Sequence, residues 1–407
     1  MNKKIGIVAL IIITFAGCTQ MPQQTPEVST QPAIEIDLAT ATTAQLMQET
    51  PTQKPATTEN GQPLITLPAP VYFLYDDGGK NGLFRLEPNG VEVIKITDEP
   101  LEVTDFAINP LDGSVAYITD NKIMHAGALG ENKQVLIDGE PISQTDQYFW
   151  REKIGCPSWS PDGKILAFSQ GGLRFLHMQS NKVTLEVENL ITTVTGIGDI
   201  PKEIYAPSLW SPDSTRLIVD IGYYEGSTIG VYHLNRSELV QPASPSSLCC
   251  TESWSLDGSL IYVSSPFLGM IQPGLWTLDP ESGSVNALVE AASVDGPFEF
   301  IGWAVQNSAD SLVYLYGQSA RIPDGSSEPL SLHQSGLDGV NGRIELNSGK
   351  LKLREVLWSP DYSFALGLGD QMQLYGVDLS IIPASGDEIL TIPFNGSFIA
   401  WGLPIKE

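Results

Sequence analysis

The sequence CPSWSPDGKILAFS occupies residues 156–169, and it decides the fold of this chain. It begins with a short strand that carries the large aromatic Trp159. The turn at 161–163 follows, in which Pro presets φ, Asp accepts hydrogen bonds from its own backbone and Gly tolerates a positive φ. Ile165–Phe168 is a second strand, apolar enough to be buried. The stretch therefore predicts a β-hairpin about a dozen residues long.

This hairpin recurs along the chain. Other anchor residues followed by an apolar strand are Phe106, which has one extra turn residue behind it, and Trp210, Trp254, Trp303 and Trp358. Trp401 is a last anchor with no second strand after it. Successive anchors lie roughly 43 to 55 residues apart, the length of one propeller blade.

The repeat, Trp-Ser-Pro-Asp-Gly followed by an apolar strand, resembles that of TolB-like and WD-repeat-like β-propeller proteins over about residues 68–404. The resemblance implies an all-β fold of four-stranded antiparallel blades. Val71–Tyr75 opens the domain without a Trp-bearing strand before it, and Phe398–Gly402 is such a strand without successors. We therefore expect the C-terminal strand to complete the N-terminal blade and to close a ring of seven blades. Six blades, or unrelated hairpins of a β-sandwich, are the alternatives.

The N-terminus predicts export. Lys3 and Lys4 precede an apolar run, residues 5–15, that is too short to span a membrane and is typical of a signal peptide. Phe15-Ala-Gly-Cys18 then resembles a bacterial lipobox, with Phe where Leu is usual. The resemblance implies that Cys18 receives a diacylglyceryl thioether and further acyl chains such as palmitate, and becomes the mature N-terminus. Ordinary secretion is the alternative, and the absence of Asp beside Cys18 permits outer-membrane sorting in a diderm.

Composition divides the chain into three parts: a lipoprotein signal peptide at 1–17, a disordered Thr/Pro/Gln-rich tether at 18–67, and the propeller domain at 68–407. The tether has too little apolar periodicity to order itself. The 48 acidic residues exceed the 22 basic ones and give a net charge of −26. This excludes nucleic acid and anionic lipid surfaces as favoured partners, because both require basic clusters.

No cofactor or metal site is predicted. The four histidines fall at third-strand positions of different repeats, too far apart to share one ion; they are His125, His177, His233 and His333. Cys156, Cys249 and Cys250 are left after lipidation of Cys18. They admit buried free thiols or a strained bond between the adjacent pair, whereas a bond across the channel conflicts with the expected distance.

No nucleophile elbow, zinc-protease motif or phosphate-binding loop occurs, so no catalytic residue is assigned. Propellers similar to this one can precede a serine peptidase domain, and the sequence predicts no such domain here. The remaining candidates for ligand binding are aromatic or basic residues in loops expected on one face. They are Tyr148, Trp150, Arg151, Tyr205, Tyr223 and Tyr224.

The sequence thus favours a monomeric, non-catalytic binding scaffold outside the cytoplasmic membrane, attached to that or the outer membrane by lipid and bound to an envelope protein or a glycan. The alternatives are a propeller hydrolase or lyase that acts on glycan at the channel mouth, and a TolB-like envelope assembly factor. A mouth pocket with two carboxylates within reach of one ligand atom would favour the enzyme.

Overall fold

The computed structural model describes residues 67–142, 148–195, 198–223, 226–243, 248, 251–265, 274–290, 297–319, 329–351, 353–360, 362, 364–369, 373–378, 390–395 and 397–403. These residues form antiparallel strands and one short 3-10 helix, η1 (Phe149–Arg151). No helix among them is long and apolar enough to cross a bilayer. The signal peptide, nearly all of the tether, Tyr224, Cys18, Cys249 and Cys250 lie outside the described residues.

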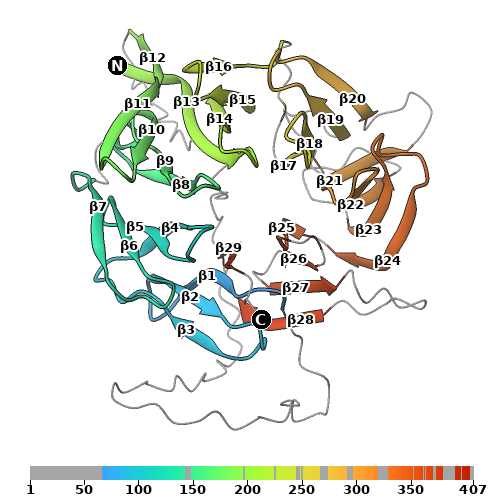
Figure 1. Cartoon of the computed structure of the whole chain (residues 1–407), viewed down its shortest axis with the longest axis horizontal. Helices are drawn as coiled ribbons and strands as arrows, with labels where there is room; N and C mark the ends of the chain where they lie inside the picture. Colours follow the sequence, from blue (N-terminus) through green and yellow to red (C-terminus); the bar gives the residue numbers. More distant parts are fainter. Residues whose placement is uncertain are drawn as a thin grey trace, which may run out of the picture. The chain divides into compact units, whose positions relative to one another are not determined.

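The strands form a series of antiparallel sheets that lie side by side around a common centre (Figure 1). This is the architecture of a β-propeller. In spatial order within each group, the strands are β29 (Ser397–Trp401), β1 (Val71–Asp76), β2 (Asn81–Leu86) and β3 (Val93–Lys95); β4 (Val103–Ile108), β5 (Val115–Thr119), β6 (Lys122–Ala126) and β7 (Gln134–Asp138); β8 (Gly155–Trp159), β9 (Ile165–Ser169), β10 (Gly172–His177) and β11 (Lys182–Glu188); β12 (Leu190–Val194), β13 (Gly198–Trp210), β14 (Arg216–Tyr223), β15 (Gly226–His233) and β16 (Glu238–Val240); β17 (Thr251–Trp254), β18 (Ile261–Ser265), β19 (Gly274–Leu278) and β20 (Val285–Glu290); β21 (Phe298–Gln306), β22 (Ser311–Ser319), β23 (Leu330–Gly336) and β24 (Ile344–Leu351); and β25 (Leu353–Trp358), β26 (Phe364–Gly369), β27 (Gln373–Asp378) and β28 (Leu390–Asn395).

Two of these groups are continuous, because Ser265 of β18 pairs with Ile301 of β21. β29 comes from the C-terminus, yet it pairs with β1 near the N-terminus, with Val71 opposite Trp401 and Tyr72 opposite Ala400. The sequence predicted this pairing, because Val71–Tyr75 and Phe398–Gly402 are the incomplete first and last units of the repeat.

The core consists of apolar layers between neighbouring sheets. Successive residues of a strand point to opposite faces, so each sheet packs on two neighbours. Phe73 of β1 packs with Phe364 of β26, whereas the adjacent Tyr72 packs with Tyr117 of β5. Each layer lies between sheets from consecutive repeats, so the second strand of a hairpin faces a neighbouring sheet on both sides. This explains why that strand is apolar throughout.

The recurring Ser and Asp of the motif fasten the hairpin turn. Ser160 Oγ donates to Asp162 Oδ1 at 2.7 Å, and accepts from the backbone N–H of Ile165 at 3.0 Å. Gly163 has a φ of +65° and donates its N–H to the Ser160 carbonyl at 2.8 Å. Equivalent bonds join Ser255 and Asp257 in the turn between β17 and β18. Hydrogen bonds from Ser259 and Ser255 lower the pKa of Asp257 to about 2.

Four anchor tryptophans tie their inner strand to the preceding inner strand. The indole N–H of Trp210 donates to the Ser158 carbonyl at 3.2 Å, and that of Trp254 donates to the Leu209 carbonyl at 3.1 Å. Trp358 and Trp401 make the same kind of bond to the strand before them. Burial was expected for four of these anchors; Trp159, Trp210 and Trp254 are buried, whereas Trp358 is only half-buried.

Two anchors were misidentified from the sequence. Trp159 pairs with Leu166 across its hairpin, and the residues in that register elsewhere are Ile108, opposite Val115, and Gln306, opposite Leu312. Phe106 is therefore not the Trp equivalent, and its turn has no extra residue. A β-bulge precedes the anchor: Trp303 has a φ of +53° and lies three residues before Gln306, as Cys156, with a φ of +52°, lies before Trp159.

Cys156 is disulfide-bonded, so the free-thiol alternative is wrong for this residue.

Candidate functional site

Three of the predicted ligand-binding residues, Tyr148, Trp150 and Arg151, gather at the start of β13. Two more, Tyr205 and Tyr223, lie near Glu203, further along that strand. We call Tyr148, Trp150, Arg151, Asp199, Glu203, Tyr205 and Tyr223 the aromatic cluster. The Arg151 guanidinium lies over the Tyr148 ring at 4.7 Å and over the Trp150 ring at 5.4 Å from the ring centroids. It also forms an ion pair with Asp199 of β13. The Arg151 guanidinium is therefore in contact with two aromatic rings and one carboxylate of the protein itself.

Tyr205 and Tyr223 both lie near the carboxylate of Glu203. The Tyr205 hydroxyl donates to Glu203 Oε2 at 2.6 Å, and burial followed by this hydrogen bond raises the pKa of Tyr205. Burial and the Glu203 charge also raise the pKa of Tyr223. Tyr205 lies within β13 and Tyr223 is the last residue of β14, so both lie in strands rather than in the loops that the sequence predicted.

Exposure separates the predicted contact residues into two groups. Trp150 is 8% exposed and Tyr205 is 4% exposed, so both rings serve mainly to pack the cluster. Tyr148 and Arg151 are half-buried, and Tyr223 is 37% exposed. Within the described part of the cluster, the groups accessible to a partner are therefore Tyr148, Arg151 and Tyr223.

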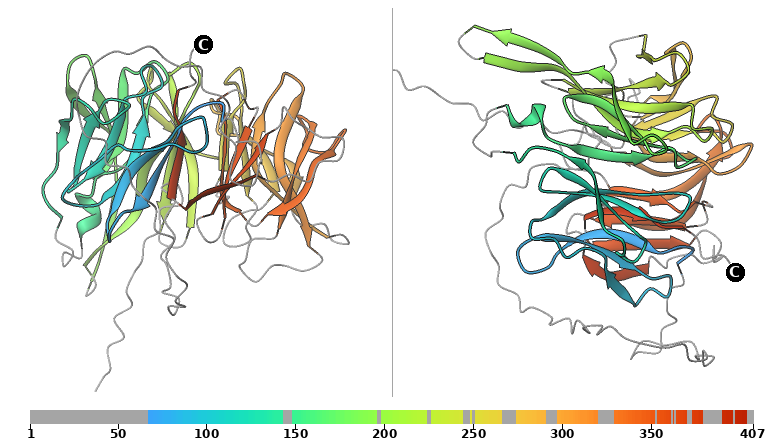
Figure 2. Two further views of the ribbon diagram at one scale, coloured as in Figure 1. Left: turned by 90° about the horizontal axis from the view of Figure 1, so that it is seen from below. Right: turned by 60° about the vertical axis from the view of Figure 1, so that its left-hand side comes forward.

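The cluster supports a projecting hairpin that sequence reasoning missed. β12 pairs with the first half of β13, with Val194 opposite Gly198, and this light-green hairpin extends beyond the neighbouring strands (Figure 2, right). Gly198 has a φ of +103°, and a Cβ there would lie 2.4 Å from the Tyr148 hydroxyl. The Arg151–Asp199 pair lies at the same point. η1 thus fixes the base of the hairpin.

β12 is an exposed edge strand. Leu190 and Ile191 are each 42% exposed, Thr192 and Thr193 are exposed, and the strand carries no charge. It ends the order of its sheet, so one of its edges has no partner strand among the residues that the structure describes. The signal in the sequence was the β-branched run Ile-Thr-Thr-Val at 191–194, followed at once by a glycine-containing turn.

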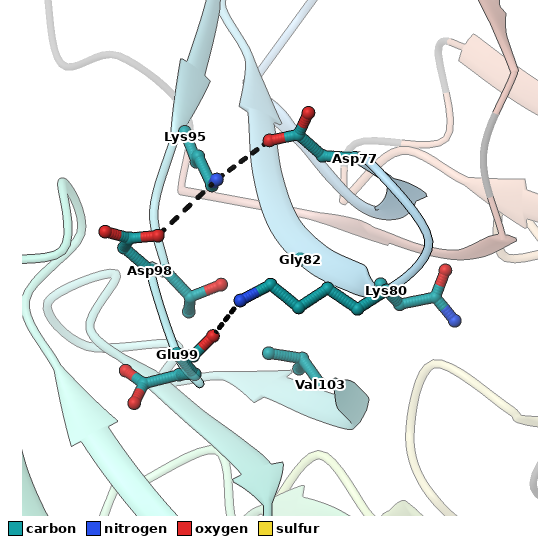
Figure 3. A pocket seen from close by; sticks show the side chains of 9 residues that line it. Asp77, Lys80, Gly82, Lys95, Asp98, Glu99 and Val103 are labelled. Carbon is teal, nitrogen blue, oxygen red and sulfur yellow. Dashed lines mark hydrogen bonds and ion pairs between the residues drawn. The ribbon is translucent and has the colours of Figure 1, made fainter. Parts of the chain in front are cut away.

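A second feature is a charged depression between the β1–β3 and β4–β7 sheets (Figure 3). Its volume is about 10 Å³, close to what one water molecule needs. Lys95 lies 2.8 Å from Asp77 and 3.7 Å from Asp98, and the Lys80 ammonium donates to the Glu99 carbonyl. Both lysines are paired within the protein, which argues against a ligand site in this depression.

A third feature is a set of carboxyl groups on strands near the centre of Figure 1. Asp105 on β4 accepts the backbone N–H of Cys156 at 2.9 Å, and burial raises its pKa to about 7. Glu355 on β25 has its pKa raised to about 7 by burial alone. Asp220 on β14 and Glu252 on β17 belong to the same set.

We expect Glu355→Gln to stabilise the protein at pH 8 and to have little effect at pH 4. An unfolded Glu ionises near pH 4.3, whereas the folded carboxyl stays neutral up to about pH 7. Stability therefore falls as pH rises from about 4 to 7 and then levels off, and the neutral amide removes that loss. A full shift of this size is worth about 3 to 4 kcal/mol. Because Glu355 is only half-buried, we expect a gain at pH 8 of roughly 2 kcal/mol, measured by urea unfolding at both pH values. An equal effect at the two pH values would contradict the raised pKa.

Comparisons with known proteins bear on the fold alone. No protein-family model and no curated protein sequence matches the chain. Prolyl oligopeptidase B from Galerina marginata is 12% identical with a TM-score of 0.52, over 81% of this chain and 49% of that one. A second prolyl endopeptidase is 12% identical with a TM-score of 0.50, over 84% of this chain and 51% of that one.

TolB from Acinetobacter baumannii is also among the structures that this chain resembles. It is 14% identical with a TM-score of 0.41, over 67% of this chain and 62% of that one. The chain thus spans about half the length of the two peptidases and less than two thirds of this TolB.

Proposed function

We propose that this protein is a lipid-anchored, extracytoplasmic β-propeller that binds another envelope protein through β12. The proposed partner contributes an extended segment, which adds a strand to the free edge of β12. Binding of this kind relies on backbone hydrogen bonds, which a polypeptide offers along its length and a glycan does not. We further propose seven blades, supported by the place of β29 beside β1 and by an apolar layer shared by the β1 and β26 sheets.

The observation that carries this proposal is the exposed, uncharged edge of β12. Proteins usually protect such an edge with lysine, proline or a covering segment, because it recruits other chains. Here Leu190 and Ile191 are exposed instead, and η1 holds the hairpin in its projecting position through Arg151 and Asp199. An edge that is both rigidly supported and unprotected suits a strand-adding partner.

Photo-crosslinking tests this binding mode. A photoreactive residue at position 191 of the full-length protein in native membranes should yield one dominant adduct, and Leu190→Lys should reduce its amount. Val135, which is 50% exposed on the outer strand β7, provides the control position. Equal adducts at positions 191 and 135, or an adduct that Leu190→Lys does not reduce, would refute docking at β12.

The anchor is proposed from the signal-like N-terminus and the lipobox at Cys18. A flexible tether of about 50 residues reaches roughly 40 Å, enough to hold a domain clear of lipid headgroups. We expect mass spectrometry of membrane-extracted protein to find acyl groups on a peptide that begins at Cys18. Cys18→Ser should release the protein from the membrane fraction, and an unmodified Cys18 in soluble protein would contradict the anchor.

The alternative of a glycan-acting enzyme required two carboxylates open to one ligand atom. Asp220 and Glu252 form a carboxyl pair, but Asp220 is only 6% exposed, which leaves no approach for a sugar ring. This pair is therefore considered separately.

A further inference from the structure

Asp220 and Glu252 face each other across the layer between the β13–β16 and β17–β20 sheets. Ile218 of β14 packs in this layer with Trp254 of β17. Asp220 lies two residues beyond Ile218, and Glu252 lies two residues before Trp254. Residues two apart on a strand share a face, so both carboxyls point into the same layer.

The residues that the structure describes provide these carboxyls with no counter-charge. Asp220 Oδ2 and Glu252 Oε1 are both buried and have no hydrogen-bond partner among the residues that the structure describes. Burial raises the pKa of both groups, and the Asp220 charge raises that of Glu252 further. An uncompensated buried charge is costly, so a pair of this kind must be protonated, hydrated or bound to a cation.

The described neighbours of the pair leave its charge uncompensated. Around the pair, Ile218, Ile229 and Val263 are apolar. The indole N–H of Trp276, in the same layer, is also buried and without a partner in the described part of the chain. It can donate to a water molecule but cannot neutralise a carboxylate. Two carboxylates carry two negative charges, which one divalent cation balances.

We propose that Asp220 and Glu252 bind a hard divalent cation, Ca²⁺ or Mg²⁺, between these two sheets. Carboxylate oxygens are the ligands that such ions prefer, and waters complete their coordination. The bound ion would fasten the β13–β16 sheet to the β17–β20 sheet in place of a direct contact between the two acidic side chains. A pair that merely shares a proton is the competing explanation.

The test uses the full-length protein in detergent, stripped of metal with EDTA, at pH 8 and 150 mM NaCl. Calorimetric titration with CaCl₂ and with MgCl₂ should show one binding site for at least one ion, and that ion should raise the melting temperature. The isosteric variants Asp220→Asn and Glu252→Gln should each lose at least about tenfold in affinity. Circular dichroism checks that they remain folded.

Glu355→Gln is the matched control, since it also removes one buried carboxyl from a central strand, and it should bind as the wild type does. Absence of binding by the wild type would overturn the proposal in favour of a shared proton. Unchanged affinity in both pair variants would also overturn it, because the ion would then be bound elsewhere on this acidic surface.

Discussion

Deletion of residues 397–407 is expected to lower the melting temperature sharply and to cause aggregation. The deletion removes β29, which pairs with β1 through Val71 and Tyr72. It also removes Ile399, which is 6% exposed and packs in the core layer with Phe73 and Phe364. β1 would then present an unpaired edge of apolar residues, and such edges recruit other chains.

The measurement is thermal unfolding together with size-exclusion chromatography. Removal of residues 404–407 alone is the control, because it leaves β29 and the bond from the Gly402 N–H to the Pro70 carbonyl, 2.7 Å long. A shortened protein that lacks β29 but stays monodisperse with an unchanged melting temperature would refute the proposed closure by this strand.

Trp210→Ala is expected to cost on the order of 3–5 kcal/mol in free energy of unfolding, the range for a large aromatic truncated in a core. Trp210 is 4% exposed and packs with Phe175, whose ring centroid lies 5.5 Å away. Its indole N–H also bonds to the Ser158 carbonyl of the preceding inner strand. The substitution therefore removes both a buried ring and a tie between two sheets.

Phenylalanine substitutions separate these two contributions. Trp159 is 7% exposed, but its indole N–H has no partner among the described residues. Trp210→Phe should therefore cost about 1 kcal/mol more than Trp159→Phe, the usual net worth of one hydrogen bond. Urea unfolding of both variants measures this difference. Equal costs would mean that the indole bond contributes nothing to stability, and a Trp210→Ala cost below about 1 kcal/mol would contradict the anchor role.

The sequence by itself determined the structural features that depend on residues close together in the chain. The turn of Ser160, Asp162 and Gly163 is held by bonds that span five residues or fewer, so its recurrence was readable and indicated an all-β repeat fold. The apolar second strands followed from the same pattern. Exposed, uncharged residues at 190–194 were readable as a strand but were not recognised, because they lie outside the repeat.

Tertiary structure alone decided the features that depend on register and on contacts between repeats. A bulge with a positive φ at Trp303 moves Gln306 into the anchor register, and nothing local in the sequence signals that shift. The burial of Trp150 depends on where η1 lies relative to β13. Asp220 and Glu252 come from different repeats and meet only when two sheets pack, so their shared, unpartnered burial is a property of the fold rather than of either segment.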